Sequence, residues 1–187
     1  MKMPSFYAGI EGDKNAYRKI FDFAKEMGVE VLIAEPPPEM FETLDGLCAE
    51  YKMKLAVHNH PEGSGSKYWN PDTLMAACQG RSSRIGACPD TGHWVRSGLD
   101  TLESLRKYKD RIVAVHLKDA AEMGKRDSRD VPLGTGKANY TALLQQRLDW
   151  KWRGIMSIEY EHLSPQLVQD VAHVGQVDLG AAQPLGE

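Results

Sequence analysis

The sequence predicts an α/β protein of the (β/α)8 barrel type, and three observations lead to this fold class. Short apolar runs, typical of strands buried in a parallel sheet, alternate with helical patterns along the whole chain. Several runs end in a residue that can bind a metal ion, and this type of barrel gathers its chemistry at the carboxyl ends of its strands. An open doubly wound sheet usually has a glycine-rich phosphate loop after its first strand, and this chain has none there.

The first half of the chain contains three β/α units. Apolar runs indicate strands over residues 6–10, 30–35 and 54–58, and helices are expected over residues 15–27, 39–51 and 71–77. The first helix has an apolar face and ends before Gly28, which is typical of a helix terminus. That face consists of Ile20, Phe23, Ala24 and Met27. The second helix follows a turn of three prolines. Proline is favoured in the first turn of a helix.

The second half repeats the pattern with longer connections. Strands are expected over residues 84–90, 111–116 and 154–159, with helices over 101–108 and 140–148 and a weaker one over 164–173. A long polar loop precedes the helix at 140–148. We therefore expect one barrel-type domain over residues 1–173 and a flexible tail over residues 174–187.

The number of units is short of a full barrel. A (β/α)8 barrel usually takes about 250 residues, and we find roughly six β/α units in this chain. Either two N-terminal units are missing, or another copy of the chain covers the open edge strands. Since an uncovered strand edge is an aggregation liability, we expect a homodimer or a larger homo-oligomer.

Composition excludes several classes of function. The net charge of -3 provides no basic surface for nucleic acid or an anionic membrane. No stretch approaches the roughly 18 apolar residues of a membrane span, and the N-terminus lacks the apolar core of a signal peptide. The chain has three cysteines and no C-x-x-C pair, which is typical of reduced thiols. We therefore expect a cytoplasmic protein without nucleic-acid or membrane partners.

Four residues at strand ends form the candidate metal site. Glu35, Asp90, His116 and Glu159 each close a separate apolar run. Three carboxylates and one imidazole suit Mn²⁺, our favoured ion, and also Mg²⁺, Co²⁺ or Zn²⁺. Glu35 and Glu159 are also the candidate catalytic residues. Two carboxylates beside a hydroxy-ketone can remove a proton from one carbon and return one to the same or the adjacent carbon, while the metal stabilises the enediolate.

Two histidines are candidate substrate-binding residues near this site. His93 follows Asp90 by three residues and can approach the same cavity. His58 closes another strand and is expected to face the cavity. Alternate strand residues share a face, so His60 could point the same way. Pro61 indicates that the strand has ended by then, and we expect His60 to lie outside the site.

Three further candidates each have an equally ordinary interpretation. Lys118 could place an ammonium near an anionic oxygen of a substrate, or form a solvated charge pair with Asp119 at the start of a loop. Trp69 and Trp94, expected in loops at the barrel mouth, could pack on a sugar ring or simply anchor those loops. The backbone of residues 134–136 could bind phosphate, although a tight turn is the preferred interpretation.

These motifs resemble the sugar phosphate isomerase/epimerase group of xylose-isomerase-like barrels, which also includes ketose 3-epimerases, inosose-processing enzymes and endonuclease IV-type nucleases. The segments that carry the resemblance are residues 28–36, 58–60, 86–93, 116–119, 130–136 and 158–162. It implies a metal held by Glu35, Asp90, His116 and Glu159, with the two glutamates as acid and base. It also implies that His93 contacts the substrate.

The chain departs from this group in two ways. Where the nucleases have Asp-x-His, this chain has Asp130-Val131-Pro132, so one ligand of a third metal is absent and DNA cleavage is not expected. Relatives in this group also begin with two further β/α units.

Three functional hypotheses remain open on the sequence. The leading one is a metal-dependent isomerase or epimerase acting on a sugar, sugar phosphate or keto-sugar. The second keeps the site but eliminates the aglycone of a 3-keto-glycoside. The third is an inactive, shortened barrel that serves as a binding module.

Overall fold

Six parallel strands form the frame of the molecule. The computed structural model describes residues 3–9 and 14–172. Strands β1 (Ser5–Tyr7), β2 (Val31–Ala34), β3 (Lys54–His58) and β4 (Ile85–Cys88) pair in chain order, and β5 (Ala114–Leu117) pairs with β8 (Ile155–Ile158). Backbone hydrogen bonds and parallel bridges join β4 to β5, among them Val113 N to Ala87 O at 2.9 Å. The α/β barrel-type fold is confirmed, and the chain forms part of such a barrel.

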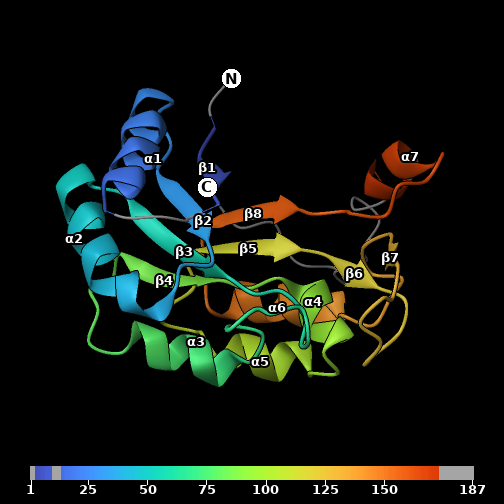
Figure 1. Ribbon diagram of the computed structural model, residues 1–187. Coiled ribbons are helices and arrows are strands. Elements are labelled where there is room, and N and C mark those ends of the chain that lie inside the picture. The colour runs from blue at the N-terminus through green and yellow to red at the C-terminus, as the bar shows by residue number, and fades with distance from the viewer. Residues whose placement is uncertain (1–2, 10–13, 173–187) are drawn as a thin grey trace.

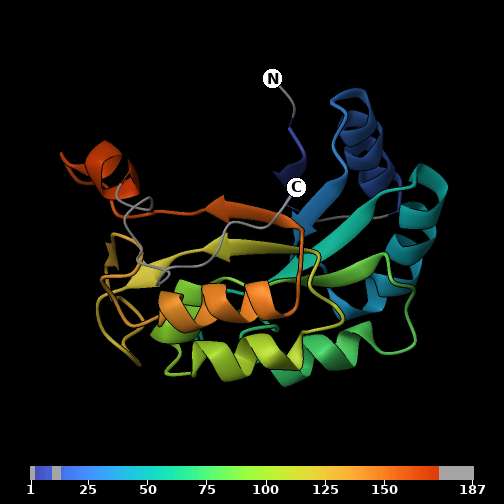
Figure 2. The ribbon, with the colours of Figure 1, turned by 180° about the vertical axis from the view of Figure 1, so that it is seen from behind.

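Seven α-helices accompany the strands within the described residues, and most of them connect one strand to the next. They are α1 (Lys14–Glu26), α2 (Phe41–Tyr51) after the short 3-10 helix η1 (Pro38–Met40), α3 (Pro71–Cys78), α4 (Thr91–Arg96), α5 (Thr101–Lys107), α6 (Tyr140–Asp149) and α7 (Leu167–Ala172). In Figures 1 and 2, α3, α5 and α6 run side by side beneath the sheet, and α1 and α2 stand together at one end. No helix in the described ranges is long and apolar enough to cross a membrane.

Two elements were not expected from the sequence. Helix α4 begins directly after Asp90, whose side chain accepts a hydrogen bond from His93 N at 2.8 Å and so caps the helix. A small antiparallel pair, β6 (Asp119–Ala120) and β7 (Asp130–Val131), lies within the segment expected to be a polar loop. The predicted tail over 174–187 lies outside the described residues.

The apolar face of α1 differs from the prediction. Tyr17, Phe21 and Ala24 are buried, whereas Phe23 and Met27 are exposed. The buried positions follow an i, i+4, i+7 spacing, so the helix turns a neighbouring stripe toward the sheet.

The core positions the strand ends rigidly. Side chains of β2, β3 and β4 are almost all buried, and a small cluster of Val31, Ile33, Ala56, Cys88 and Ala114 fills the inner side of the sheet. The outermost strand β8 is only half-buried. Within the described residues, β1 and β8 each pair with a strand on one side only. Homo-oligomerisation across these edges stays a prediction.

Candidate metal centre

The four predicted metal ligands lie at the carboxyl ends of four strands. Glu35 follows β2, Asp90 stands between β4 and α4, His116 lies within β5, and Glu159 follows β8. Strand pairing continues to Glu159, whose N–H donates to Leu117 O at 3.0 Å. Because the strands are parallel, all four side chains lie at the same end of the sheet.

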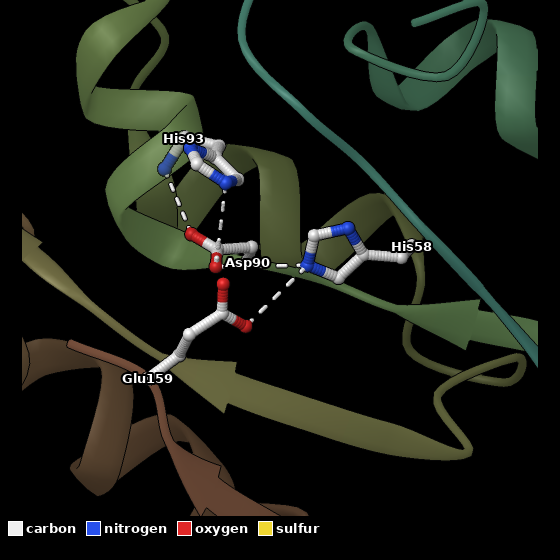
Figure 3. A group of neighbouring side chains, drawn as sticks. All are labelled: His58, Asp90, His93 and Glu159. Atoms are coloured by element: carbon white, nitrogen blue, oxygen red, sulfur yellow. Dashed lines mark hydrogen bonds and ion pairs between the residues drawn. The ribbon is translucent and has the colours of Figure 1, made fainter. Parts of the chain in front are cut away.

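A compact group of ligand atoms lies at this end. In Figure 3 the side chains of His58, Asp90, His93 and Glu159 point toward one another, with ligand atoms all within 4.8 Å of one another. His58 Nε2 lies 3.6 Å from Asp90 Oδ2 and 3.8 Å from Glu159 Oε2. His116 Nδ1 contacts the same Glu159 oxygen. Nitrogen and oxygen ligands lie about 2.0–2.2 Å from a bound zinc ion. Two ligand atoms that share one ion are therefore up to about 4 Å apart, which agrees with the separations of 3.6 and 3.8 Å measured here.

Within the described residues, three buried atoms of the group make no hydrogen bond of ordinary geometry: His58 Nε2, Asp90 Oδ2 and His116 Nδ1. Their neighbours are charged, since His116 Nδ1 contacts Glu159 Oε2 and Asp90 Oδ2 lies 3.4 Å from Lys118 Nζ. A cation among these atoms would bind donors that the protein's own hydrogen bonds leave unsatisfied. Imidazole and carboxylate donors suit Mn²⁺, Co²⁺ or Zn²⁺. The residues present therefore fit a divalent metal ion.

Glu35 lies on the other side of the His58 ring. Its Oε1 is 3.4 Å from His58 Nδ1 and also contacts His60 Nδ1. The predicted set therefore divides: Asp90 and Glu159 lie at the Nε2 side of His58, and Glu35 lies at its Nδ1 side. The expectation that His60 lies outside the site is wrong. Although β3 ends at His58, the following loop turns His60 back to Glu35.

Ion pairs set the charges of these groups. Burial alone raises the pKa of Glu35, but hydrogen bonds from His58 and His60 lower it to about 2. Burial likewise opposes ionisation of Glu159, while its contacts with His116 and Lys118 lower its pKa to about 2. Burial lowers the pKa of His58, but Asp90 and Glu35 together raise it to about 9. Without a metal, His58 is therefore a cation between carboxylates.

A buried ammonium completes the charge balance. Lys118 is fully buried, and its Nζ lies 2.8 Å from Glu159 Oε1, 2.8 Å from Glu161 Oε2 and 3.4 Å from Asp90 Oδ2. The alternative of a solvated charge pair is thereby excluded. Burial lowers the pKa of His93 to about 4, and the nearby Lys118 ammonium also opposes its protonation. His93 is therefore neutral, and its two ring nitrogens face cations: Nε2 lies 3.2 Å from Lys118 Nζ and Nδ1 lies 3.2 Å from Arg96 Nη1.

Comparison with known proteins identifies the family. A model of the xylose isomerase-like TIM barrel family matches residues 14–176. The chain belongs to this family.

Several relatives can be compared directly. An inosose dehydratase of Clostridium perfringens is 35% identical over 107 residues, which cover 55% of this chain and 35% of that protein. An uncharacterized protein from Sinorhizobium fredii is 26% identical over 132 residues, 70% of this chain and 40% of the other. A crystal structure from Parabacteroides distasonis has a TM-score of 0.67 at 29% identity and covers 94% of this chain and 70% of that one. The chain thus spans 35–40% of the length of these two curated relatives.

A structure of a D-tagatose 3-epimerase-like protein shares the fold. It has a TM-score of 0.67 at 22% identity and covers 87% of this chain and 69% of that one. At this identity the likeness concerns the fold alone.

In this xylose isomerase-like chain the two tryptophan candidates have different positions. Trp94 is completely buried in α4, and its ring lies 5.6 Å from that of Tyr108. The expectation of Trp94 in a loop at the barrel mouth is therefore wrong, because the Asp90 cap starts a helix that turns this side chain into the core. Trp69 lies partly buried in the loop before α3. Its role as a substrate contact stays a prediction.

The glycine turn at residues 134–136 is already occupied by a carboxylate of the protein. Asp119 Oδ2 accepts hydrogen bonds from Gly134 N at 3.0 Å and Gly136 N at 2.9 Å. A Cβ at position 136 would collide with this carboxylate and with Ala120 O. The preferred interpretation of a tight turn is therefore confirmed.

Sequence reasoning missed two neighbours of the site. Asn59 positions Asp90, since its Oδ1 accepts from Asp90 N at 2.9 Å and its Nδ2 donates to Asp90 O at 3.3 Å. Tyr7, at the end of β1, packs edge-on against His58 with ring centroids 5.6 Å apart. Tyr7 also closes a strand, which was a usable signal. Asn59 has no pattern that sets it apart from an ordinary loop residue.

Proposed function

We propose that this chain is a divalent-metal-dependent isomerase or epimerase that acts on a sugar, sugar phosphate or keto-sugar by proton transfer. The observation that carries the proposal is the placement of Glu35 and Glu159. These two carboxylates lie at opposite nitrogens of the His58 ring, beside buried ligand atoms that make no hydrogen bond with the described residues. Epimerisation requires a base on one side of the reacting carbon and an acid on the other.

In this proposal the residues of the site have separate roles in proton transfer and in activation of the substrate. Glu159 removes the proton from the carbon next to the carbonyl. Glu35 is ionised, so the proton that it returns on the other side comes from the His58 imidazolium through the Nδ1 contact. His58 regains a proton from Glu159 at its Nε2 side. Both carboxylates are ionised at neutral pH and weakly basic, so the carbon acid must be activated. A divalent ion held by Asp90, His116 and Glu159 would supply that activation by polarising the carbonyl. Lys118 holds Glu159 through its buried ammonium and lies beside His93, and a role of Lys118 and His93 in orienting substrate oxygens stays part of the proposal.

A dehydratase is the second candidate, and a specific observation favours it. The relatives that are 35% identical over part of this chain are inosose dehydratases. Dehydration also begins with removal of a proton next to a carbonyl, and it then expels a hydroxyl from the adjacent carbon. The same base and the same metal site therefore serve either outcome.

One experiment separates these reactions. The Mn²⁺-loaded protein is incubated in D₂O with D-tagatose and, separately, with an inosose, and ¹H NMR follows both substrates. Deuterium incorporation with a new diastereomer supports the epimerase, and loss of water supports the dehydratase. Glu159→Gln should abolish either signal and leave the fold intact, while Glu122→Gln, at an exposed glutamate, should leave it unchanged. No exchange with either substrate, or full activity of Glu159→Gln, would contradict the proposal.

A further inference from the structure

Glu161 is a carboxylate of the site that no part of the mechanism has used. It follows Glu159 by two residues, and side chains two apart in an extended chain point to the same side. Both glutamates contact Lys118 Nζ at 2.8 Å, Glu159 through Oε1 and Glu161 through Oε2. Since the same ammonium lies 3.4 Å from Asp90 Oδ2, Glu161 is one side chain away from the ligand group.

Arg96 on α4 holds Glu161 from the opposite side. Its Nη1 donates to Glu161 Oε2 at 2.8 Å, and its Nη2 donates to Asp130 Oδ1 at 2.7 Å. Its Nε donates to Ser128 O at 3.0 Å. The guanidinium therefore bridges β7 and the chain after β8. Besides Glu161 it has three contacts, with Asp130, Ser128 and His93, the last between Nη1 and His93 Nδ1 at 3.2 Å.

Asp130 fixes the backbone of the same residue. Its Oδ2 accepts a hydrogen bond from Glu161 N at 2.6 Å, while its Oδ1 binds Arg96. Asp130 is buried, and Arg96 is 11% exposed. Both the main chain and the carboxylate of Glu161 are thus held by groups with little freedom to move.

The held carboxylate still has a free oxygen. Oε2 accepts from both Arg96 and Lys118, whereas Oε1 has no hydrogen bond within the residues that the structure describes. The Glu161 side chain is 46% exposed, compared with 28% for Glu159 and 17% for Glu35. This oxygen is therefore open beside the ligand group and available to a bound molecule.

We infer that Glu161 binds a hydroxyl group of the polyhydroxylated substrate through Oε1, and that Arg96, anchored on Asp130, is its positioning residue. An ionised carboxylate accepts strong hydrogen bonds from hydroxyl donors, which sugars and cyclitols present on adjacent carbons. Glu161 thereby selects the substrate by a hydroxyl away from the reacting carbon. The inference rests on the proposed function, because it assumes a substrate bound at the Asp90–Glu159 group.

The test compares Glu161→Gln, Arg96→Met and the double variant with Glu122→Gln. In the Mn²⁺-loaded protein, KM for the substrate that exchanges deuterium should rise about tenfold or more in Glu161→Gln, with a much smaller change in kcat. Arg96→Met should raise KM less, because Lys118 still holds Glu161. The rise in the double variant should be smaller than the product of the two single rises, since Arg96 acts in part through Glu161 and in part through its contact with His93. Mn²⁺ affinity should stay near the wild-type value in all of these variants. The melting temperature should stay unchanged in Glu122→Gln and should fall in Arg96→Met, which leaves the buried Asp130 carboxylate without its ion-pair partner. KM is therefore compared at a temperature at which every variant is folded.

Two results would overturn the inference. An unchanged KM in Glu161→Gln would make the cluster a structural tie. A tenfold loss of Mn²⁺ affinity would make Glu161 a metal ligand instead. If the wild type turns over neither substrate, the proposed function fails, and binding of myo-inositol and D-tagatose by saturation-transfer NMR replaces KM. A binding signal that Glu161→Gln removes still supports the role of Glu161, and equal or absent signals contradict it.

Discussion

Gly92, in the segment between Asp90 and His93, is predicted to tolerate no side chain. A methyl group there would lie 2.5 Å from Lys118 Cγ and 2.9 Å from its Cβ and Cδ. These atoms belong to the stem of a buried lysine whose ammonium is held by Glu159 and Glu161. The side chain cannot swing away without breaking those ion pairs. Gly92 does not have a positive φ, so the effect is steric and free of backbone strain.

The expected magnitude follows from three effects. Overpacking of this kind costs about 1–3 kcal/mol, and the lost contacts of Lys118 add to it. The better helix propensity of alanine returns about 1 kcal/mol. We therefore expect Gly92→Ala to lower the free energy of unfolding by about 1–2 kcal/mol and to reduce turnover.

A second glycine provides the matched control for this substitution. Gly46 is exposed in α2, and a methyl group there meets no atom within 4 Å. Gly46→Ala should raise the free energy of unfolding by about 0.5–1 kcal/mol. Urea denaturation followed by circular dichroism measures both variants. A Gly92→Ala protein at least as stable as wild type would refute the steric reasoning.

Three further predictions concern the carboxylate turn and the histidines. Asp119→Ala should lower the free energy of unfolding, measured by urea denaturation, by at least about 4 kcal/mol. The reason is that four backbone N–H groups that bind this carboxylate lose their partner. A loss below about 1 kcal/mol would show that water replaces the carboxylate. In metal-free protein the pKa of His58 is raised from 6.5 to about 9, so its contribution of about 3 kcal/mol is complete below pH 6.5 and is lost as pH rises through 9. Melting temperature should therefore fall over that interval, and a His58→Asn variant should show a flatter profile; equal slopes would exclude His58 as the cause. His116→Ala should reduce Mn²⁺ affinity and turnover more than His60→Ala, and the reverse order in calorimetry and kinetics would mean that the metal lies on the Glu35 side of His58.

The regular alternation of apolar strand runs with helical patterns made most of the fold predictable. The strand at Lys54–His58 has the predicted bounds, and those of β2, β4 and β8 lie within the predicted runs, because continuous apolar runs bounded by turns are typical of buried parallel strands. Helix α4 escaped prediction because its six residues are too few for a visible period. The sequence nevertheless carries a signal for the start of α4, since aspartate is a favoured N-cap residue and Asp90 stands at that position. The same aspartate was interpreted only as a metal ligand.

The site was predictable only as a set of strand ends. The strand pattern and the parallel order of the strands place Glu35, Asp90, His116 and Glu159 at one end of the sheet. Side-chain directions depend on the course of loops, which carry no period, so the turn that brings His60 to Glu35 was missed. The clamp of Arg96 and Asp130 on Glu161 joins segments more than 30 residues apart, and a single sequence carries no signal for such pairs.

Metal content tests most directly the proposed divalent metal site at the group of His58, Asp90, His93 and Glu159, against which His116 lies. The protein is purified without chelators, loaded with Mn²⁺, desalted and measured by inductively coupled plasma mass spectrometry beside an Asp90→Asn variant. The account predicts about one ion per wild-type chain and a large loss in the variant. A wild-type chain that retains no ion, or a variant that retains as much as wild type, would contradict it.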